Sequence, residues 1–386
     1  MTVLPKFEVL EDRIVLAGAD PDVTFTTTNP DEVIELGEQD VAFTLTFDNT
    51  GTDSGYVPFA EIIIPTSGAD GEGDGPTFDS APFLGSPITT TEVVFDVNGE
   101  AEHPFLLDPD GDPLVISGTE GDTLVVLELP YGSFSPGNPA VDIDVVIDFS
   151  PEADLNANPT FGVVGGFALG CDELDNAYDE FGDPIDPPIR EVMASTSVDP
   201  QLFQVTKANT APESEASTGP NYVYQYVLTI DVAPGQTLTD FTLTDTLPPE
   251  LVYVGNPVVI SGPGVVDTIS EPPVGQVTAP NNQLVVEFEE GSETVTVTFD
   301  YYIRNSPSTG GTTNSATTGA DEDVINSVTG EGLWTPIDTD DAPVLVNDSA
   351  TDTVTASTLS VQKSNERITD NQATNQATPE DIYEFT

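Results

Sequence analysis

Apolar and polar residues alternate with a period of two along several stretches of the chain, and this alternation constrains the fold more than any other feature. The clearest stretches are 41–47, 141–149, 222–232 and 295–303. In the first of them Phe43 and Leu45 share one face while Thr44 lies on the other, as in a β-strand with one buried face. Clusters of Gly, Pro, Asn and Ser separate the stretches, and no segment keeps a helical period beyond a turn or two. The sequence therefore predicts an all-β protein made of β-sandwiches.

Similar segments recur along the chain and predict a tandem arrangement. The matching pairs are 43–65 with 226–248, 124–130 with 284–290, 141–149 with 295–303, and 203–209 with 359–365. We therefore expect a leader or sorting segment at 1–19, a divergent first sandwich at 20–200, a second sandwich at 201–357 and the start of a third repeat at 358–386. The third repeat stops inside an expected strand, which suggests a longer parent protein.

The charge balance excludes several classes of function. The chain has 68 Asp and Glu against 7 Lys and Arg, for a net charge of −61. Such a surface repels nucleic acid and cannot present a polybasic patch to anionic lipids. One Cys and one His exclude an intrachain disulfide, a thiolate metal cluster and a His-rich zinc site. No run of 18 or more apolar residues predicts a membrane-spanning helix.

One region resembles a known family of surface domains. The segment FTLTDTLPPELVYVG, preceded by LFQVTKAN and YVYQYVLTIDVAPG, resembles the bacterial "conserved repeat" domains. Those domains are Ig-like sandwiches that occur in tandem in large extracellular proteins. The resemblance covers the second sandwich and the start of the third repeat, whereas in the first sandwich Thr28 stands where the others have Lys. It implies a tandem Ig-like surface protein rather than an activity.

The N-terminus shows a second resemblance, limited to about ten residues. The string LEDRIVLAGA is similar to the LEPR-XLL motif at the start of large planctomycete-type surface proteins. Leu10, Glu11, Arg13 and Leu16 match the motif, and Asp12 replaces its usual Pro. A leader without fixed structure is the alternative interpretation.

The resemblance also implies a candidate covalent cross-link. Surface sandwiches of this kind sometimes join a Lys to an Asn across the core, with a buried acid that moves protons. Lys207 would be the amine, Asn314 or Asn326 the amide and Asp245 the acid. The general tendency of lysine to stay on the surface favours instead an exposed Lys207.

A turn in the first sandwich is a candidate calcium site. In FLLDPDGDPLVI, Asp108, Asp110 and Asp112 alternate around Gly111. Alternate carboxylates on a turn supply the oxygen ligands that Ca²⁺ prefers. The alternative is a plain Asp/Gly/Pro hairpin turn that needs no metal. Calcium is the one cofactor that the sequence suggests.

Other acidic groups are better explained as solvated loops. They are Asp70, Glu72 and Asp74; Asp338, Asp340 and Asp341; and the stretch 172–188. Catalysis is not expected, because His103 lies outside any nucleophile motif and neighbouring carboxylates would suppress the reactivity of Cys171.

Aromatic residues leave two alternatives open. Tyr222, Tyr224 and Tyr226 could form a sugar-binding platform, but at period two they are more often one face of a core. Trp334 could be an exposed contact or an interdomain plug.

These observations predict a non-enzymatic structural or adhesive module of a large bacterial cell-surface or secreted protein, located outside the cell. Its partners would be neighbouring repeats of the same chain and an extracellular protein or glycan. Two alternatives remain: an accessory glycan-binding region of a larger secreted enzyme, or a self-assembling surface-layer or sheath subunit.

Overall fold

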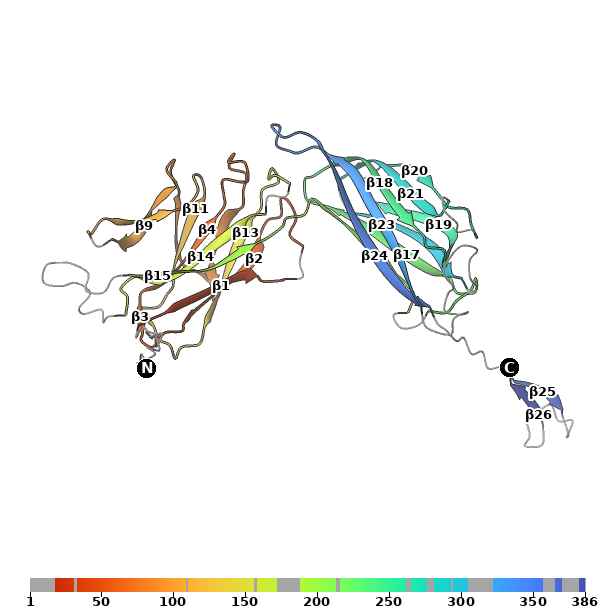
Figure 1. The fold of residues 1–386 in the computed structure, drawn as a ribbon, viewed down its shortest axis with the longest axis horizontal. Coiled ribbons are helices and arrows are strands. Elements are labelled where there is room, and N and C mark those ends of the chain that lie inside the picture. Colours follow the sequence, from red (N-terminus) through yellow and green to blue (C-terminus); the bar gives the residue numbers. More distant parts are fainter. Residues whose placement is uncertain are drawn as a thin grey trace, which may run out of the picture. The chain divides into compact units, whose positions relative to one another are not determined.

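The computed structural model confirms the predicted all-β fold, built of β-sandwiches. It describes residues 18–30, 33–108, 110–155, 158–171, 188–212, 216–261, 265–275, 281–292, 294–304, 322–356, 365–369 and 382–385. All regular elements in these ranges are β-strands (Figure 1). The chain divides into a first unit, residues 1–202 with 233–236 and 337–340, and a second unit that contains the rest.

Two antiparallel sheets form the sandwich of the first unit. The four-stranded sheet runs in the order β1 (Pro21–Thr27), β2 (Val41–Asn49), β13 (Val141–Asp148) and β5 (Thr77–Ser80). The five-stranded sheet runs in the order β15 (Ile189–Ser197), β14 (Thr160–Phe167), β4 (Pro58–Ile64), β11 (Thr123–Glu128) and β8 (Thr89–Val94). Short pairs complete the unit: β9 (Glu100–Leu107) with β10 (Pro113–Ser117), β3 (Gly55–Tyr56) with β12 (Ser133–Phe134), and β6 (Pro82–Phe83) with β7 (Ser86–Pro87).

The second unit repeats this plan. Its four-stranded sheet runs in the order β16 (Phe203–Asn209), β17 (Tyr224–Val232), β22 (Val295–Ile303) and β19 (Leu251–Ser261). Its five-stranded sheet runs in the order β20 (Val265–Ser270), β21 (Gln283–Gly291), β18 (Leu238–Thr246), β23 (Glu322–Trp334) and β24 (Val344–Ala356). The strands that the sequence paired as repeats, such as β13 and β22, occupy equivalent places in the two sheets.

The predicted alternation appears directly in the burial of the strands. Along β2 the odd positions are buried and the even ones are partly or fully exposed, which matches the stretch 41–47. The strand expected to start at Tyr222 begins instead at Tyr224. Tyr226 is fully buried and contributes to the core, whereas Tyr222 is exposed, so the three tyrosines do not form one continuous exposed platform. Trp334 is also buried, and it is therefore not an exposed contact.

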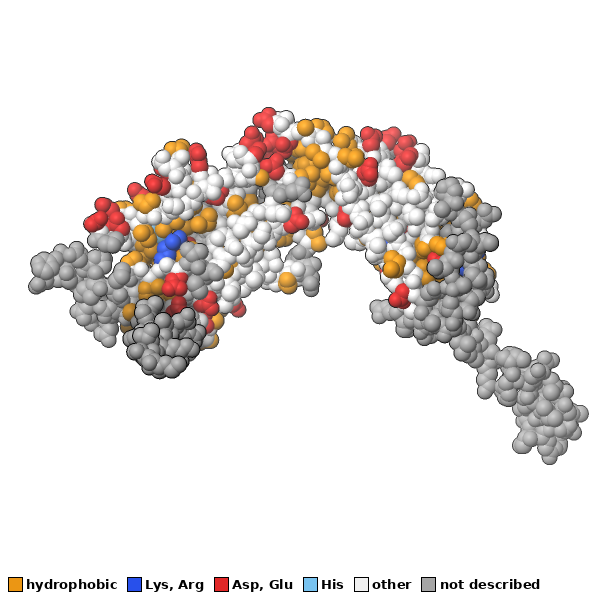
Figure 2. Space-filling model, in the orientation of Figure 1, with side chains coloured by type: hydrophobic (Ala, Val, Ile, Leu, Met, Phe, Trp, Pro, Cys, Tyr) orange, Lys and Arg blue, Asp and Glu red, His pale blue; other side chains and the backbone are white. Residues whose placement is uncertain are grey.

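The core of the first unit is aromatic, and the surface is acidic. Phe25 stacks on Phe43 with ring centroids 4.9 Å apart, and Phe161 packs against both. Figure 2 shows groups of Asp and Glu side chains at the surface and few Lys or Arg on the visible face. Hydrophobic burial thus drives the fold while carboxylates keep the exterior solvated.

Two predictions concern the ends of the chain, of which the structure describes little. The N-terminal motif with Leu10, Glu11, Asp12, Arg13 and Leu16 lies outside the described residues. Of the expected third repeat, only β25 (Asn365–Thr369) and β26 (Ile382–Phe385) are described, and they pair antiparallel.

Candidate functional site: a buried lysine, aspartate and asparagine

Lys207 lies in the core of the second unit, so the expectation of an exposed side chain is wrong. The residue occupies β16, where Phe203, Val205 and Lys207 alternate as buried positions. None of its side chain is exposed. The strand's period of two places Lys207 on the inner face regardless of its charge, because a change of face would also expose Phe203 and Val205.

Asp245 and Asn326 reach the same point from the opposite sheet. Asp245 lies on β18 and Asn326 on its neighbour β23, and both residues are fully buried. The Lys207 ammonium contacts Asp245 Oδ2 as an ion pair. Asn326 Nδ2 donates a hydrogen bond of 3.1 Å to Asp245 Oδ1, and Asn326 Oδ1 has no hydrogen-bond partner among the described residues. Asn314, the other predicted amide, lies outside the described residues.

Burial shifts this pair toward its neutral forms. Loss of solvation lowers the pKa of Lys207, against the opposing attraction of Asp245. Loss of solvation likewise raises the pKa of Asp245, although Lys207 and Asn326 act against the change. A charge is unfavourable in an apolar interior, so burial favours the neutral form of each group while their mutual attraction favours the ion pair. The site therefore places an amine with a lowered pKa beside a carboxyl group with a raised pKa and an amide.

Two aromatic rings line the same position. Lys207 Nζ lies 4.2 Å from the ring centroid of Tyr226 and 5.8 Å from that of Phe299. Tyr226 in turn stacks on Tyr301, with centroids 4.2 Å apart. These rings cover the amine and restrict its position beside Asp245.

The first unit has an aromatic residue at the place of Lys207. The fifth residue of β1 is Phe25, which pairs with Leu45, just as the fifth residue of β16 is Lys207, which pairs with Leu228. The equivalent position is therefore Phe25 and not Thr28, because the strand register rather than the local sequence similarity sets the alignment.

The first unit contains a different buried polar group around Glu61. The fully buried Glu61 carboxylate accepts hydrogen bonds of 2.7 Å from Arg190 Nε and of 2.7 Å from Arg190 Nη2. His103 Nε2 lies 3.5 Å from Glu61 Oε1, while His103 Nδ1 accepts a hydrogen bond of 3.0 Å from the Leu106 amide. Burial alone would raise the pKa of Glu61, but His103 and Arg190 hold it below its ordinary value. His103 thus lies beside the buried ion pair of Glu61 and Arg190. Cys171 packs partly buried against the core.

The predicted calcium loop forms a tight hairpin turn between β9 and β10. Asp108 Oδ1 accepts hydrogen bonds of 2.9 Å and 3.0 Å from the amides of Asp110 and Asp112. Gly111 has a φ of 84°, which a turn of this kind requires. These contacts use one of the candidate ligand oxygens within the turn, and the calcium site at Asp108, Asp110 and Asp112 stays a prediction.

Two other groups bring together carboxylates from segments that lie far apart along the chain. In the described part of the first unit, oxygens of Asp70, Asp74 and Asp154 lie within 4.8 Å of one another. A second group of Glu72, Asp338 and Asp340 meets the same limit. The sequence indicated acidic loops at 70–74 and 338–341 but gave no signal for Asp154, whose approach depends on the tertiary fold.

The chain is similar to known proteins only at the level of solved structures, and only distantly. No family model and no curated protein matches it. Among solved structures, BcpA, the major pilin subunit of Bacillus cereus, is 11% identical over 69% of this chain and 68% of that one, with a TM-score of 0.28. The full-length major pilin SpaD from Corynebacterium diphtheriae is 13% identical over 79% of this chain and 62% of that one, with a TM-score of 0.28. The B domain of a biofilm associated protein is 12% identical over 86% of each chain, with a TM-score of 0.24.

At these TM-scores the similarities carry no argument about function. Within the described ranges, no helix has the length and apolar character needed to cross a membrane.

Proposed function

We propose that the chain is a structural or adhesive module of a bacterial cell-surface or secreted protein, and that an intramolecular amide bond between Lys207 and Asn326 locks its second unit. The observation that carries the proposal is that the fully buried Asp245 contacts both Lys207 and Asn326 in the core of the sandwich. An ion pair this deeply buried is weak as a stabilising element, because desolvation offsets its attraction. A covalent bond between the same groups removes that penalty.

The reaction follows from the protonation states that burial favours. A proton passes from the Lys207 ammonium to Asp245, which leaves a neutral amine and a carboxylic acid. The amine nitrogen attacks Cγ of Asn326 while Asp245 donates its proton to the amide oxygen, as general acid. The resulting tetrahedral intermediate collapses after Asp245 returns a proton from the former lysine nitrogen to the Asn326 nitrogen. As the bond between Cγ and that nitrogen breaks, Asp245 takes back the proton from the former amide oxygen, which becomes a carbonyl again. Ammonia leaves, and Asp245 ends as a carboxylic acid.

The position of the bond suits a module that transmits force. It would join β16, the first strand of the second unit, to β23, a strand near the C-terminal end of that unit. The two strands belong to opposite sheets. A pull on the two ends of the unit would then pass through covalent bonds instead of through the hydrogen bonds of the sheets. Placement outside the cell agrees with the net charge of −61, which keeps an exposed protein soluble. Neighbouring repeats and an extracellular protein or glycan remain the proposed partners.

Intact-mass measurement of the purified chain tests the proposal. We expect a mass lower than that of the sequence by one ammonia, and a branched peptide joining the segments that contain Lys207 and Asn326 after proteolysis. Asp245→Asn should restore the full mass, because the replacement cannot carry out the proton transfers. Asp144→Asn changes an exposed carboxylate of the first unit and should keep the mass deficit. An unmodified mass for the wild-type chain overturns the proposal.

A further inference from the structure

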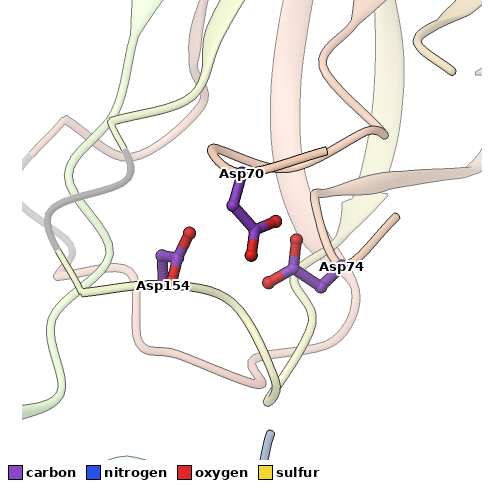
Figure 3. Close-up of side chains that lie close together, drawn as sticks. All are labelled: Asp70, Asp74 and Asp154. Carbon is purple, nitrogen blue, oxygen red and sulfur yellow. The ribbon is translucent and has the colours of Figure 1, made fainter. Parts of the chain in front are cut away.

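We propose that Asp70, Asp74 and Asp154 form a binding site for a hard divalent cation of the calcium type, separate from the hairpin loop at 108–112. Figure 3 shows the three carboxylates pointing toward one another from two separate loops. Their ligand oxygens lie within 4.8 Å of one another. Two oxygens on one calcium ion are separated by at most twice the Ca–O distance, which is about 4.6–5.2 Å. The oxygens therefore lie close enough to share one such ion.

Asp74 provides the independent sign of a ligand. Only 9% of this residue is exposed, and its Oδ1 has no hydrogen-bond partner among the described residues. A buried carboxylate oxygen without a partner is unfavourable, and native structures rarely leave one in that state. A bound cation can satisfy such an oxygen, and oxygens of two further carboxylates lie within 4.8 Å of an Asp74 carboxylate oxygen.

The electrostatics of the group point the same way. Burial raises the pKa of Asp74, and repulsion from Asp70 adds to the effect, while backbone amides of Asp74 and Asp154 oppose it. Three carboxylates whose oxygens lie within 4.8 Å of one another also repel each other. A divalent cation would reverse this balance, because it attracts all three carboxylates at once.

The surrounding loop leaves room for the carboxylate and for water. A Cβ on Gly68 would lie 1.8 Å from Asp74 Oδ1, so only glycine at this position leaves Asp74 in place. Asp74 and Asp154 both border a cavity of about 310 Å³ in the first unit. Ca²⁺ binds six to eight oxygens, and a cavity of that size supplies water for the positions that the carboxylates do not fill.

Calcium titration of the chelator-stripped chain at constant ionic strength tests the site, with calorimetry and thermal melts as readouts. We expect saturable binding with a dissociation constant of about 10⁻⁴–10⁻³ M, and weaker binding of Mg²⁺, which demands tighter octahedral geometry. Asp74→Asn should weaken calcium binding at one site at least about tenfold. In chelator the same variant should melt above the wild type, since it removes the buried charge that Asp70 repels.

Controls separate this site from other acidic groups. Asp144→Asn, on the exposed face of β13, should leave the calcium titration unchanged. Asp110→Asn combined with Asp112→Asn should keep the calcium binding that Asp74→Asn weakens. If Asp74→Asn fails to fold, Asp70→Asn in the exposed part of the loop replaces it and should also weaken binding. The proposal is overturned if the wild type shows no saturable calcium binding, or if the variants at 70 and 74 both bind calcium as the wild type does. Neither result would affect the mass test of the Lys207–Asn326 bond.

Discussion

The amide bond proposed between Lys207 and Asn326 should raise the melting temperature of the second unit by an amount that the chain length sets. The bond would close a loop of about 120 residues, and the loss of loop entropy from the unfolded chain then stabilises the folded unit by about 5 kcal/mol. A domain of 150–250 residues shifts its melting temperature by about 2–4 °C for each kcal/mol. We therefore expect the second unit to melt about 10–20 °C lower when the bond cannot form.

Lys207→Met is the substitution that isolates this effect. Methionine fills much of the lysine stem's volume and carries no charge, while Asp245 can remain protonated beside Asn326. Asp245→Asn also prevents the bond, but it leaves Lys207 buried without a counter-ion, which adds a penalty of about 3–5 kcal/mol if the amine stays charged. The second variant should accordingly melt at or below the first.

Differential scanning calorimetry makes the comparison, with the transition of the first unit as an internal reference. We expect the reference transition to stay within a few degrees in both variants. The reasoning is refuted if the wild type carries the mass deficit and yet Lys207→Met moves the second transition by less than about 3 °C. It is also refuted if both transitions move together.

Three further predictions concern the rest of the molecule. Arg190→Ala leaves the fully buried Glu61 with His103 alone and should destabilise the first unit by about 3 kcal/mol at neutral pH, measured by urea unfolding. Because the pKa of Glu61 is lowered in the folded state, the contribution of the ion pair to stability is complete above the ordinary glutamate pKa of 4.5 and is lost as the pH falls through the lower folded-state pKa. A stability difference between wild type and Arg190→Ala that stays constant down to pH 2 would contradict this prediction. Limited proteolysis should cut between Val198 and Leu202, where β15 has ended and β16 has not begun, and release two resistant fragments; a single resistant core spanning both units would disprove the division. Asp110→Asn combined with Asp112→Asn tests the hairpin calcium site: the wild type should gain about 1.4 kcal/mol at calcium tenfold above the dissociation constant, and an unchanged gain in the variant would reduce the loop to a plain turn.

The sequence predicts the strands well because burial of one face leaves a period of two in the residues themselves. The stretch 295–303 coincides with β22, and 141–149 extends only one residue beyond β13. The same period also predicts the burial of Lys207, since Phe203 and Val205 precede it at alternate positions. The general surface preference of lysine was the weaker argument, because it averages over strands that lack this constraint.

Contacts between segments that lie far apart along the chain could not be predicted from the sequence. Whether Asn314 or Asn326 would approach Asp245 depends on the register of β23 against β18, which pairs Asp245 with Val328. Asp154 joins Asp70 and Asp74 only because the loop after β13 passes beside the loop after β4. Such approaches follow from backbone pairing over long separations, and local composition carries no record of them.

The two units show how one position in a sandwich can be filled in two ways. In the first unit Phe25 stacks on Phe43, and in the second Lys207 lies over Tyr226 at the equivalent place. The aromatic pair stabilises its core through burial alone, whereas the lysine brings a desolvation penalty that burial cannot offset. In the second unit the facing sheet supplies an acid, Asp245, that pairs with the amine, and an amide, Asn326, that the proposed bond would use. The desolvation cost of the lysine in the unbonded chain would then favour the proposed reaction, which gives the buried lysine a physical role as a cross-linking residue.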